Sequence, residues 1–366
     1  MDYCNGAPGI GAAGLAVLLS FDLWRPLTRG MKEEVFSALA DAAATGQTVA
    51  LGIITSVKGS SPQKIGAKAL FFPDGRVKGT LGGGCLEAEI QHRAVQCLRT
   101  GRAEKFDLLL DHDFGWDDGL ICGGKVFGVI LPHAQQAPEQ LWKRLAERAS
   151  TIEWGVDAEF KIMEAEHLTV PKDGDLIYRE RVSPPCALWI AGAGHIAQAV
   201  TPLALQLDFA VTVFDDRPAL ANYDRFPREA RIQAEVWEKL LCLELPDVPS
   251  FGLIVTRGHR HDALVLRDWI HKPFLFLGMI GSARKARLIF EQFQAEQIAT
   301  AEQLQRVACP VGINIRSQTV TEIAVSIMAQ FIQKRAELVR EVKTIRATSQ
   351  PSAALECCSL RNQGLD

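Results

Sequence analysis

The sequence predicts an α/β protein in which a doubly wound parallel sheet forms the C-terminal part and a smaller α+β domain precedes it. Three observations predict this fold class. Beyond residue 186, short apolar segments alternate with amphipathic helical ones, which is typical of a parallel sheet covered by helices on both faces. Before residue 183, β-branched segments are separated by glycine- and proline-containing turns, which favours strands and hairpins. Two adjacent prolines, at 184 and 185, separate these patterns.

Composition narrows the functional class. The chain has 366 residues, enough for about two domains. Its 48% hydrophobic and 23% charged residues exclude a disordered or fibrous protein, and a net charge of −3 does not favour a nucleic-acid partner. Nine cysteines without dense spacing indicate a reducing compartment, so we expect a cytoplasmic protein. The apolar run at 9–20 is shorter than the about 20 residues of a membrane helix, so we expect no membrane association.

The N-terminal elements follow from turn signals and periodicity. A helix is predicted at 33–44, with Gly46 as its C-cap, and a strand at 48–57. A hairpin turn is predicted at 73–75. Further strands are predicted at 67–72, 76–81, 104–110, 125–131, 159–163 and 175–181, with a helix at 139–149. A helix that opens after three glycines carries an apolar stripe at Leu86, Ile90, Ala94 and Cys97.

The C-terminal elements alternate strictly. Strands are predicted at 187–191, 210–214, 252–256 and 274–280, and helices at 196–207, 262–270 and 283–294. A long last helix begins at Thr319, where Glu322 completes a capping box, and we expect it to pack on the core or on a second copy. Its apolar stripe is Ile323, Ile327, Met328, Phe331 and Ile332. The expected domains are a poorly ordered extension at 1–30, an α+β domain at 31–183, a Rossmann-like domain at 184–342 and a flexible tail at 343–366.

A glycine-rich turn after the strand at 187–191 carries the Rossmann signal. Gly192 allows the tight turn, and Gly194 lets the backbone approach a phosphate. His195 opens a helix whose N-terminus supplies free N–H groups, and Asp215 ends the next strand, where an acid that binds a ribose belongs. These four residues predict a cofactor site at which a nucleotide or NAD(P) is one expected ligand, and a turn kept for packing alone is the alternative.

Two further loops follow predicted strands at the edge where doubly wound sheets bind ligands. In the first loop, His259, His261 and Asp262 are candidates for holding a proton or a metal, and a hydrogen-bonded loop is an equal alternative. The second loop combines a helix N-terminus with two basic side chains, Arg284 and Lys285, and suits an anion such as phosphate, with a plain helix cap as the alternative. The candidates in the second loop are Gly281, Ser282 and Arg284.

Two cysteines of the N-terminal domain lie beside glycines. Cys85 follows Gly82, Gly83 and Gly84 at a predicted helix N-terminus, where the helix dipole favours the thiolate that binds soft metals or sulfur species. Cys122 precedes two glycines in a predicted turn. Both are candidate contacts of a soft metal, whereas a small buried side chain is the alternative for each. Cys97 lies on an apolar stripe and is expected in the core.

Together these motifs resemble the XdhC/CoxI family, accessory proteins of xanthine dehydrogenase and related molybdenum hydroxylases. The resemblance covers about residues 31–331. It is carried in the N-terminal part by the segments at 59–62, 66–67, 82–87 and 122–124, and in the C-terminal part by those at 192–195, 258–262, 281–282, 310–312 and 322–327. It implies that Ser60 and Ser61 belong to the cofactor site together with the glycine and cysteine residues above.

The resemblance implies a chaperone that binds the molybdenum cofactor, protects it, assists its sulfuration and inserts it into an apo molybdenum hydroxylase of the xanthine dehydrogenase type. A cysteine desulfurase is a further implied partner, and we expect a homo-oligomer. Two alternatives remain from the residues themselves. One is an NAD(P)-dependent oxidoreductase that uses the Rossmann turn directly. The other is a Cys/His metal-binding module without a pterin.

Overall fold

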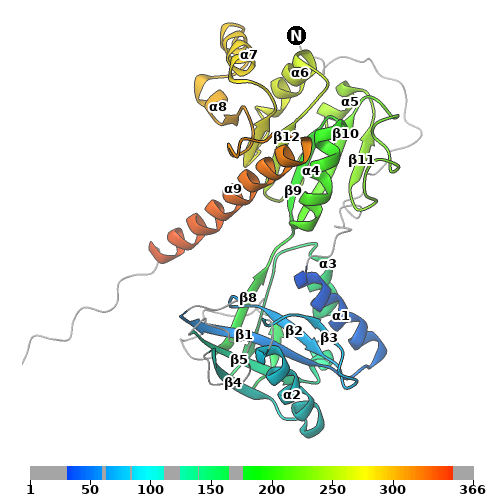
Figure 1. Cartoon of the computed structure of the whole chain (residues 1–366), viewed down its shortest axis with the longest axis vertical. Helices are drawn as coiled ribbons and strands as arrows, with labels where there is room; N and C mark the ends of the chain where they lie inside the picture. The colour runs from blue at the N-terminus through cyan, green and yellow to red at the C-terminus, as the bar shows by residue number, and fades with distance from the viewer. Residues whose placement is uncertain are drawn as a thin grey trace, which may run out of the picture.

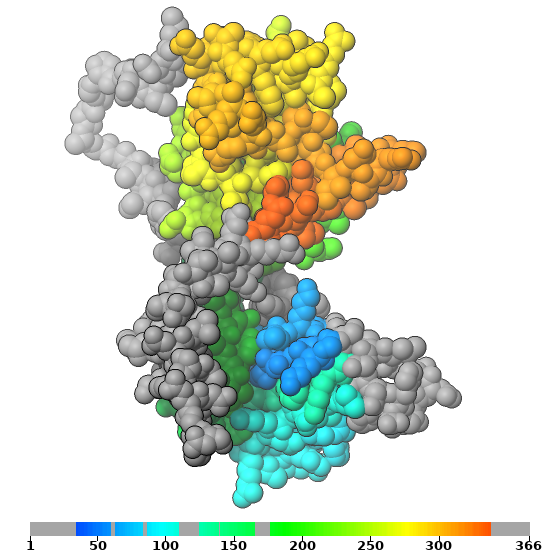
Figure 2. All heavy atoms as spheres, turned by 90° about the vertical axis from the view of Figure 1, so that its left-hand side faces the viewer, coloured from blue at the N-terminus to red at the C-terminus, as the bar shows by residue number. Residues whose placement is uncertain are grey.

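The computed structural model describes residues 31–59, 63–82, 85–110, 124–138, 140–164 and 176–348. They form two units at opposite ends of the molecule's long axis (Figure 1), and the view from the side shows the same separation (Figure 2). The N-terminal unit contains antiparallel sheets, and the C-terminal unit contains one parallel sheet. This architecture confirms the predicted fold class. Within the described segments, no helix is both long and apolar enough to cross a membrane.

A five-stranded antiparallel sheet of order β3-β2-β1-β5-β4 forms the core of the N-terminal unit. Its strands are β1 (Ala50–Lys58), β2 (Lys68–Phe71), β3 (Val77–Gly79), β4 (Glu104–Leu110) and β5 (Gly124–Pro132). Helix α1 (Met31–Thr45) covers one face and α2 (Cys85–Thr100) covers the other. The predicted stripe of α2 is confirmed, because Leu86, Ile90, Ala94 and Cys97 are buried against this sheet.

A second sheet, of order β7-β6-β8, extends the same unit. It consists of β6 (Ile152–Asp157), β7 (Ile162–Glu164) and β8 (Leu176–Val182), preceded by a 3-10 turn (Ala134–Gln136) and α3 (Leu141–Glu147). The sequence missed β6, and the strand predicted at 159–163 is largely wrong. The cause is local, because Asp157 Oδ1 accepts hydrogen bonds from the N–H groups of Glu159 (3.1 Å) and Lys161 (2.7 Å) and so forms the turn between β6 and β7.

The C-terminal unit is a six-stranded parallel sheet of order β11-β10-β9-β12-β13-β14. Its strands are β9 (Cys186–Ala191), β10 (Phe209–Asp215), β11 (Arg231–Ala234), β12 (Ser250–Ile254), β13 (Phe276–Met279) and β14 (Val307–Ala308). Helices α4 (His195–Gln206) and α9 (Val320–Thr348) cover one face. The other face packs against α5 (Trp237–Leu241), α6 (His259–Trp269), α7 (Ala283–Ala295) and α8 (Ala301–Gln305). The sequence missed the short elements β11, α5, α8 and β14.

Helix α9 begins where the sequence predicted. The N–H of Glu322 donates to Thr319 Oγ1 (3.2 Å), and Glu322 Oε2 accepts the N–H of Thr319 (3.1 Å), which confirms the capping box. Its stripe packs on the core through Ile327, Met328 and Phe331, whereas Ile332 is 39% exposed and does not belong to this core. The helix continues to Thr348, beyond the boundary at 342 expected from its polar composition.

Residues 183–185 join the two units, because β8 ends at Val182 and β9 begins at Cys186. An ion pair spans the same junction. Arg148, directly after α3, donates from Nη1 and Nη2 to the two carboxylate oxygens of Asp208 (2.7 and 2.9 Å), and its Nε donates to the carbonyl of Ser183 (2.8 Å). Asp208 lies in the turn between α4 and β10, so Arg148 ties the N-terminal unit directly to the parallel sheet.

A buried cation joins the two sheets of the N-terminal unit. The Lys68 side chain is 2% exposed, and its Nζ lies 2.6 Å from a carboxylate oxygen of Glu180 and 2.8 Å from the carbonyl of Gly66. The hydroxyl of Tyr178 lies 3.1 Å from the same Nζ, and burial raises the pKa of that hydroxyl, which stays protonated. The rings of Phe36, Trp154 and Tyr178 surround the ammonium at 5.2–5.6 Å.

Replacing this cation should destabilise the N-terminal unit. We expect Lys68→Met to lower the free energy of unfolding by about 3–5 kcal/mol, because the mostly buried Glu180 carboxylate would lose the cation that lies 2.6 Å from it. The double variant Lys68→Met/Glu180→Met should recover part of that loss. Chemical denaturation measures both, with the exposed Lys143→Met as a control. A loss below about 1 kcal/mol for Lys68→Met would contradict this account.

Candidate functional site

The carboxyl edge of the parallel sheet gathers four loops, which follow β9, β10, β12 and β13. The turn after β9 packs tightly onto β12, because Gly192 has φ +109° and a Cβ there would lie 2.4 Å from the carbonyl oxygen of Val255. Gly194 differs, since a Cβ at this position would meet no described atom within 4 Å. Gly192 is therefore required for packing, whereas Gly194 faces open space at the start of α4.

Asp215 is fully buried, and both of its carboxylate oxygens accept hydrogen bonds. Its Oδ2 accepts the N–H of Ala193 (2.7 Å), and Arg217 donates to both carboxylate oxygens through Nε (2.7 Å) and Nη2 (2.8 Å). Burial alone would raise the pKa of Asp215, but the hydrogen bonds from Arg217 and Ala193 outweigh it and hold this pKa below its ordinary value. The carboxylate thus ties the glycine turn to β10. His195, the first residue of α4, is exposed.

Asp262 is the second buried carboxylate at this edge. Its Oδ1 accepts hydrogen bonds from the N–H (3.1 Å) and the hydroxyl (2.6 Å) of Thr256, and its Oδ2 pairs with Lys285 Nζ. Lys285 Nζ also lies 3.3 Å from the carbonyl of Ile280. Asp262 therefore connects the loop after β12 to the loop after β13, and it positions the Lys285 ammonium at the carboxyl edge of the sheet.

The two histidines do not converge. His259 is exposed, whereas Nε2 of His261 lies 2.8 Å from Nη2 of Arg257 and accepts its hydrogen bond. Arg257 in turn pairs with Asp216 (3.0 Å) in the loop after β10. Across the described ranges, no group of three or more His, Cys, Asp or Glu side chains is arranged to hold a metal ion. The interpretation of this loop as a hydrogen-bonded structure thus has the stronger support.

The loop after β13 forms a capped helix start. Ser282 Oγ accepts the N–H of Lys285 (3.3 Å), and Gly281 has φ +158° with a Cβ position only 3.0 Å from Lys285 Cδ. Ser282 is exposed, and so is Arg284 on the first turn of α7. The serine therefore fulfils the cap that the sequence offered as an alternative, while Arg284 stays accessible to an anion.

The predicted residues of the N-terminal unit lie elsewhere. Cys85 is the first residue of α2, and Gly82 has φ +129° and donates its N–H to Thr80 Oγ1 (3.2 Å). The remaining predicted residues, Ser60, Ser61, Gly83, Gly84 and Cys122, fall outside the described residues. Figure 1 places α2 and the helices α6 and α7 toward opposite ends of the molecule, so a single chain keeps its two groups of candidate residues apart.

Sequence reasoning missed three polar residues at these sites. Arg217 pairs with Asp215 at the end of β10, and Arg257 pairs with Asp216, the next residue. Both arginines lie in loops that leave the carboxyl ends of strands, which is a usable signal. The third is Glu87 on the first turn of α2, where burial raises the pKa of the carboxyl despite hydrogen bonds with Leu81 and Thr80. Lys285, which the sequence offered together with Arg284 as an anion ligand, pairs with Asp262 instead.

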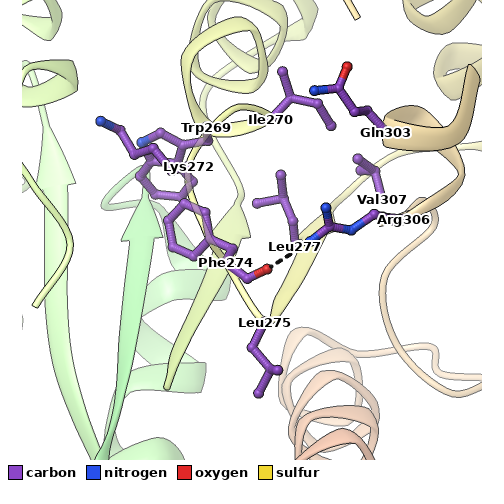
Figure 3. Close-up of a pocket in the computed structure, with 9 residues that line it drawn as sticks. All are labelled: Trp269, Ile270, Lys272, Phe274, Leu275, Leu277, Gln303, Arg306 and Val307. Atoms are coloured by element: carbon purple, nitrogen blue, oxygen red, sulfur yellow. Dashed lines mark hydrogen bonds between the residues drawn. The ribbon is translucent and has the colours of Figure 1, made fainter. Parts of the chain in front are cut away.

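A small cavity lies at the other edge of the parallel sheet (Figure 3). Its lining includes Phe274 and Leu275, which precede β13, and the Arg306 Nη2 group donates to the Phe274 carbonyl (3.3 Å). Its remaining lining residues are Trp269, Ile270, Lys272, Leu277, Gln303 and Val307. Because it opens at the amino ends of the strands, it is separate from the four loops described above.

Comparisons with known proteins match both units. A family model described as the XdhC and CoxI family matches residues 42–111, and one described as the XdhC Rossmann domain matches residues 188–331. A probable xanthine dehydrogenase subunit of Bacillus subtilis is 25% identical, over 82% of this chain and 97% of that protein. The molybdenum cofactor insertion chaperone PaoD of Escherichia coli is 24% identical, over 81% and 86%. A crystal structure of a xanthine dehydrogenase from Bacillus halodurans has the same fold, with a TM-score of 0.69 at 23% identity, over 88% of this chain and 98% of that one.

The buried Asp215 should make stability depend on pH in a defined direction. Its folded-state pKa lies below the ordinary aspartate value of about 3.9, so its contribution is complete above that value and is lost as pH falls through the folded pKa. We expect Asp215→Asn to cost about 1–3 kcal/mol at pH 7, and the difference from wild type to shrink below about pH 4. Denaturation at several pH values measures this, with the exposed Asp224→Asn as a control. A difference that grows on acidification would contradict the assignment.

Proposed function

Because the chain belongs to the XdhC and CoxI family, we propose that it binds the molybdenum cofactor, protects it, assists its sulfuration and inserts it into an apo molybdenum hydroxylase of the xanthine dehydrogenase type. The observation that carries this proposal is that one chain contains both family segments and aligns with an insertion chaperone over 86% of that protein's length. The cofactor is here a cargo, which the chain must hold and then release.

In the N-terminal unit, Cys85 is the proposed contact to the molybdenum end of the cargo. A thiol at the start of the 16-residue helix α2 is favoured as the thiolate, which is the form that binds soft metals. Cys122, Ser60, Ser61 and the glycines at 82–84 complete the proposed site by resemblance. Glu87 lies two residues after Cys85 on the same helical turn, and burial raises the pKa of its carboxyl.

In the C-terminal unit, the carboxyl edge of the sheet is the proposed site for the phosphate or nucleotide end. Open space at Gly194 allows an anion to approach the start of α4, and Arg284 is exposed at the start of α7. His195, His259 and Ser282 lie exposed at the same edge, next to the glycines at 194, 258 and 281, and Gly192 completes the first turn. Asp215, Asp262 and His261 shape this edge through the contacts described above rather than by facing a ligand.

The alternative of an NAD(P)-dependent oxidoreductase receives less support from the geometry. An acid that binds the two ribose hydroxyls must present free carboxylate oxygens to the ligand. Asp215 instead accepts four hydrogen bonds from Ala193 and Arg217. The Rossmann turn itself keeps a nucleotide as a proposed ligand of this edge.

We also propose a homo-oligomer that forms through α9, with a cysteine desulfurase and the apo-hydroxylase as its transient partners. On the face of α9 that does not pack on the core, Val325 is 48% exposed and Ile332 is 39% exposed. They lie seven residues apart and therefore on one side of the helix, the spacing of a helix–helix contact. Two copies that pair along this face would cover both side chains.

The function is tested by the cargo that the protein carries. After purification from molybdenum-replete cells, mass spectrometry should detect a pterin and molybdenum bound to the chain. Bound NAD(H) alone would instead support the oxidoreductase, and stoichiometric zinc alone would support a Cys/His metal module.

Cys85 should be the residue that most affects loading. We expect Cys85→Ser to lower the bound pterin and the activation of a partner hydroxylase, with unfolding almost unchanged. The matched control is Cys97→Ser on the same helix. Burial, with Glu104 nearby, raises the pKa of the Cys97 thiol to about 11, so it stays neutral, and a buried hydroxyl there should cost about 1–3 kcal/mol without changing the loading per folded molecule. Full loading and full transfer by Cys85→Ser would refute the thiolate role.

The role of α9 in self-association is tested separately. We expect Val325→Glu/Ile332→Glu to shift a dimer toward monomer in sedimentation velocity, because two charges per chain would enter the contact. Gln333→Glu, at an exposed neighbouring position, is the control and should leave the distribution unchanged. Wild-type protein that stays monomeric at high concentration would remove this proposal.

A further inference from the structure

One ion pair closes the carboxyl edge of the parallel sheet across its central strand. The sheet order places β9 between β10 and β12, which run parallel to it. Asp216 directly follows β10, and Arg257 follows β12. Nevertheless Arg257 Nη2 lies 3.0 Å from Asp216 Oδ2, so the pair joins the ends of the two strands that flank β9. The glycine turn at 192–194 follows the strand between them.

This position is the topological switch point of the sheet. The chain passes from β9 to β10 on one side and later continues with β12 on the other, and doubly wound sheets bind ligands at such points. A glycine starts the helix on each side, Gly194 for α4 and Gly258 for α6, and a Cβ at either position would meet no described atom within 4 Å. The ion pair therefore lies where the phosphate of a ligand would approach.

The charges of the cluster balance when no ligand is present. Asp215 pairs with Arg217, and Asp216 lies between Arg217 Nε (3.8 Å) and Arg257. Two carboxylates thus face two guanidinium groups. His261 contacts Arg257 from the α6 side and fixes the orientation of its guanidinium. Of the two arginines, Arg257 is the more exposed. Arg217 donates hydrogen bonds to both carboxylate oxygens of the buried Asp215, so it is held more firmly in place.

We propose that Asp216 occupies the place of a ligand phosphate and that binding exchanges this carboxylate for the phosphate on Arg257. This inference rests on the proposed function, because it concerns the end of the cargo that carries a phosphate or nucleotide. An internal anion keeps Arg257 oriented in the empty protein and lowers the net affinity for the incoming phosphate. That property suits a carrier, which has to release what it binds.

The exchange predicts opposite effects for its two members. In isothermal titration calorimetry of the full chain with inorganic pyrophosphate and with ADP, Asp216→Asn should bind at least one probe about threefold more tightly or better than wild type, because Arg257 loses its competing partner. Arg257→Gln should bind the same probe more weakly. In the Arg257→Gln background, adding Asp216→Asn should change nothing.

The controls separate this exchange from a general change of charge. Asp224→Asn removes the same charge from an exposed residue of the β10–β11 connection and should leave affinity unchanged. Equal tightening by Asp224→Asn, tightening by Asp216→Asn that persists without Arg257, or no binding of either probe by any variant would each overturn the proposal. The pterin content of wild-type protein tests the proposed function independently, because it does not depend on how Asp216 and Arg257 share their contacts.

Discussion

The geometry of the carboxyl edge of the parallel sheet depends on two buried carboxylates, Asp215 at the end of β10 and Asp262 on the first turn of α6. A buried charge is tolerated only when it is paired and hydrogen-bonded, so each carboxylate dictates where its donors must lie. Asp215 fixes the glycine turn and Arg217, and Asp262 fixes Thr256 and Lys285. Together with the Asp216–Arg257 pair, these contacts hold the four loops to one another through side chains and orient Arg217 and Lys285.

The sequence predicted the regular elements well because their signals are local. The stripe of α2, the capping box at Thr319 and the strands β9, β10 and β12 all follow from spacing within one segment. The short elements β6, β11, α5, α8 and β14 depend on neighbours far along the chain, and the Asp157 turn shows how one side chain can displace a predicted strand. Exposure of Ile332 could not be predicted, since it depends on how far the core extends beneath α9.

The placement of the candidate loops was predictable, but the roles of their side chains were not. The loops at 192–195, 258–262 and 281–284 lie at the carboxyl edge of the sheet as predicted, because the direction of parallel strands decides where such loops meet. The roles of individual side chains were different. Asp215 and Asp262 are ties between loops. The pairing of Arg257 with Asp216 became visible only when β10 and β12 were placed, and so did that of Lys285 with Asp262. Pairing across a sheet edge leaves no periodic trace in a sequence.

The contact of Arg148 with Asp208 has a consequence for motion between the two units. The guanidinium uses both terminal nitrogens on one carboxylate and its third nitrogen on the carbonyl of Ser183, inside the connecting segment. Planar two-point contacts of this kind weaken steeply when either partner rotates. A swivel about the connection at 183–185 must therefore break the contacts together rather than stretch them one by one. The connection therefore favours one orientation of the two units, in which all three contacts of Arg148 are formed, over small rotations away from it.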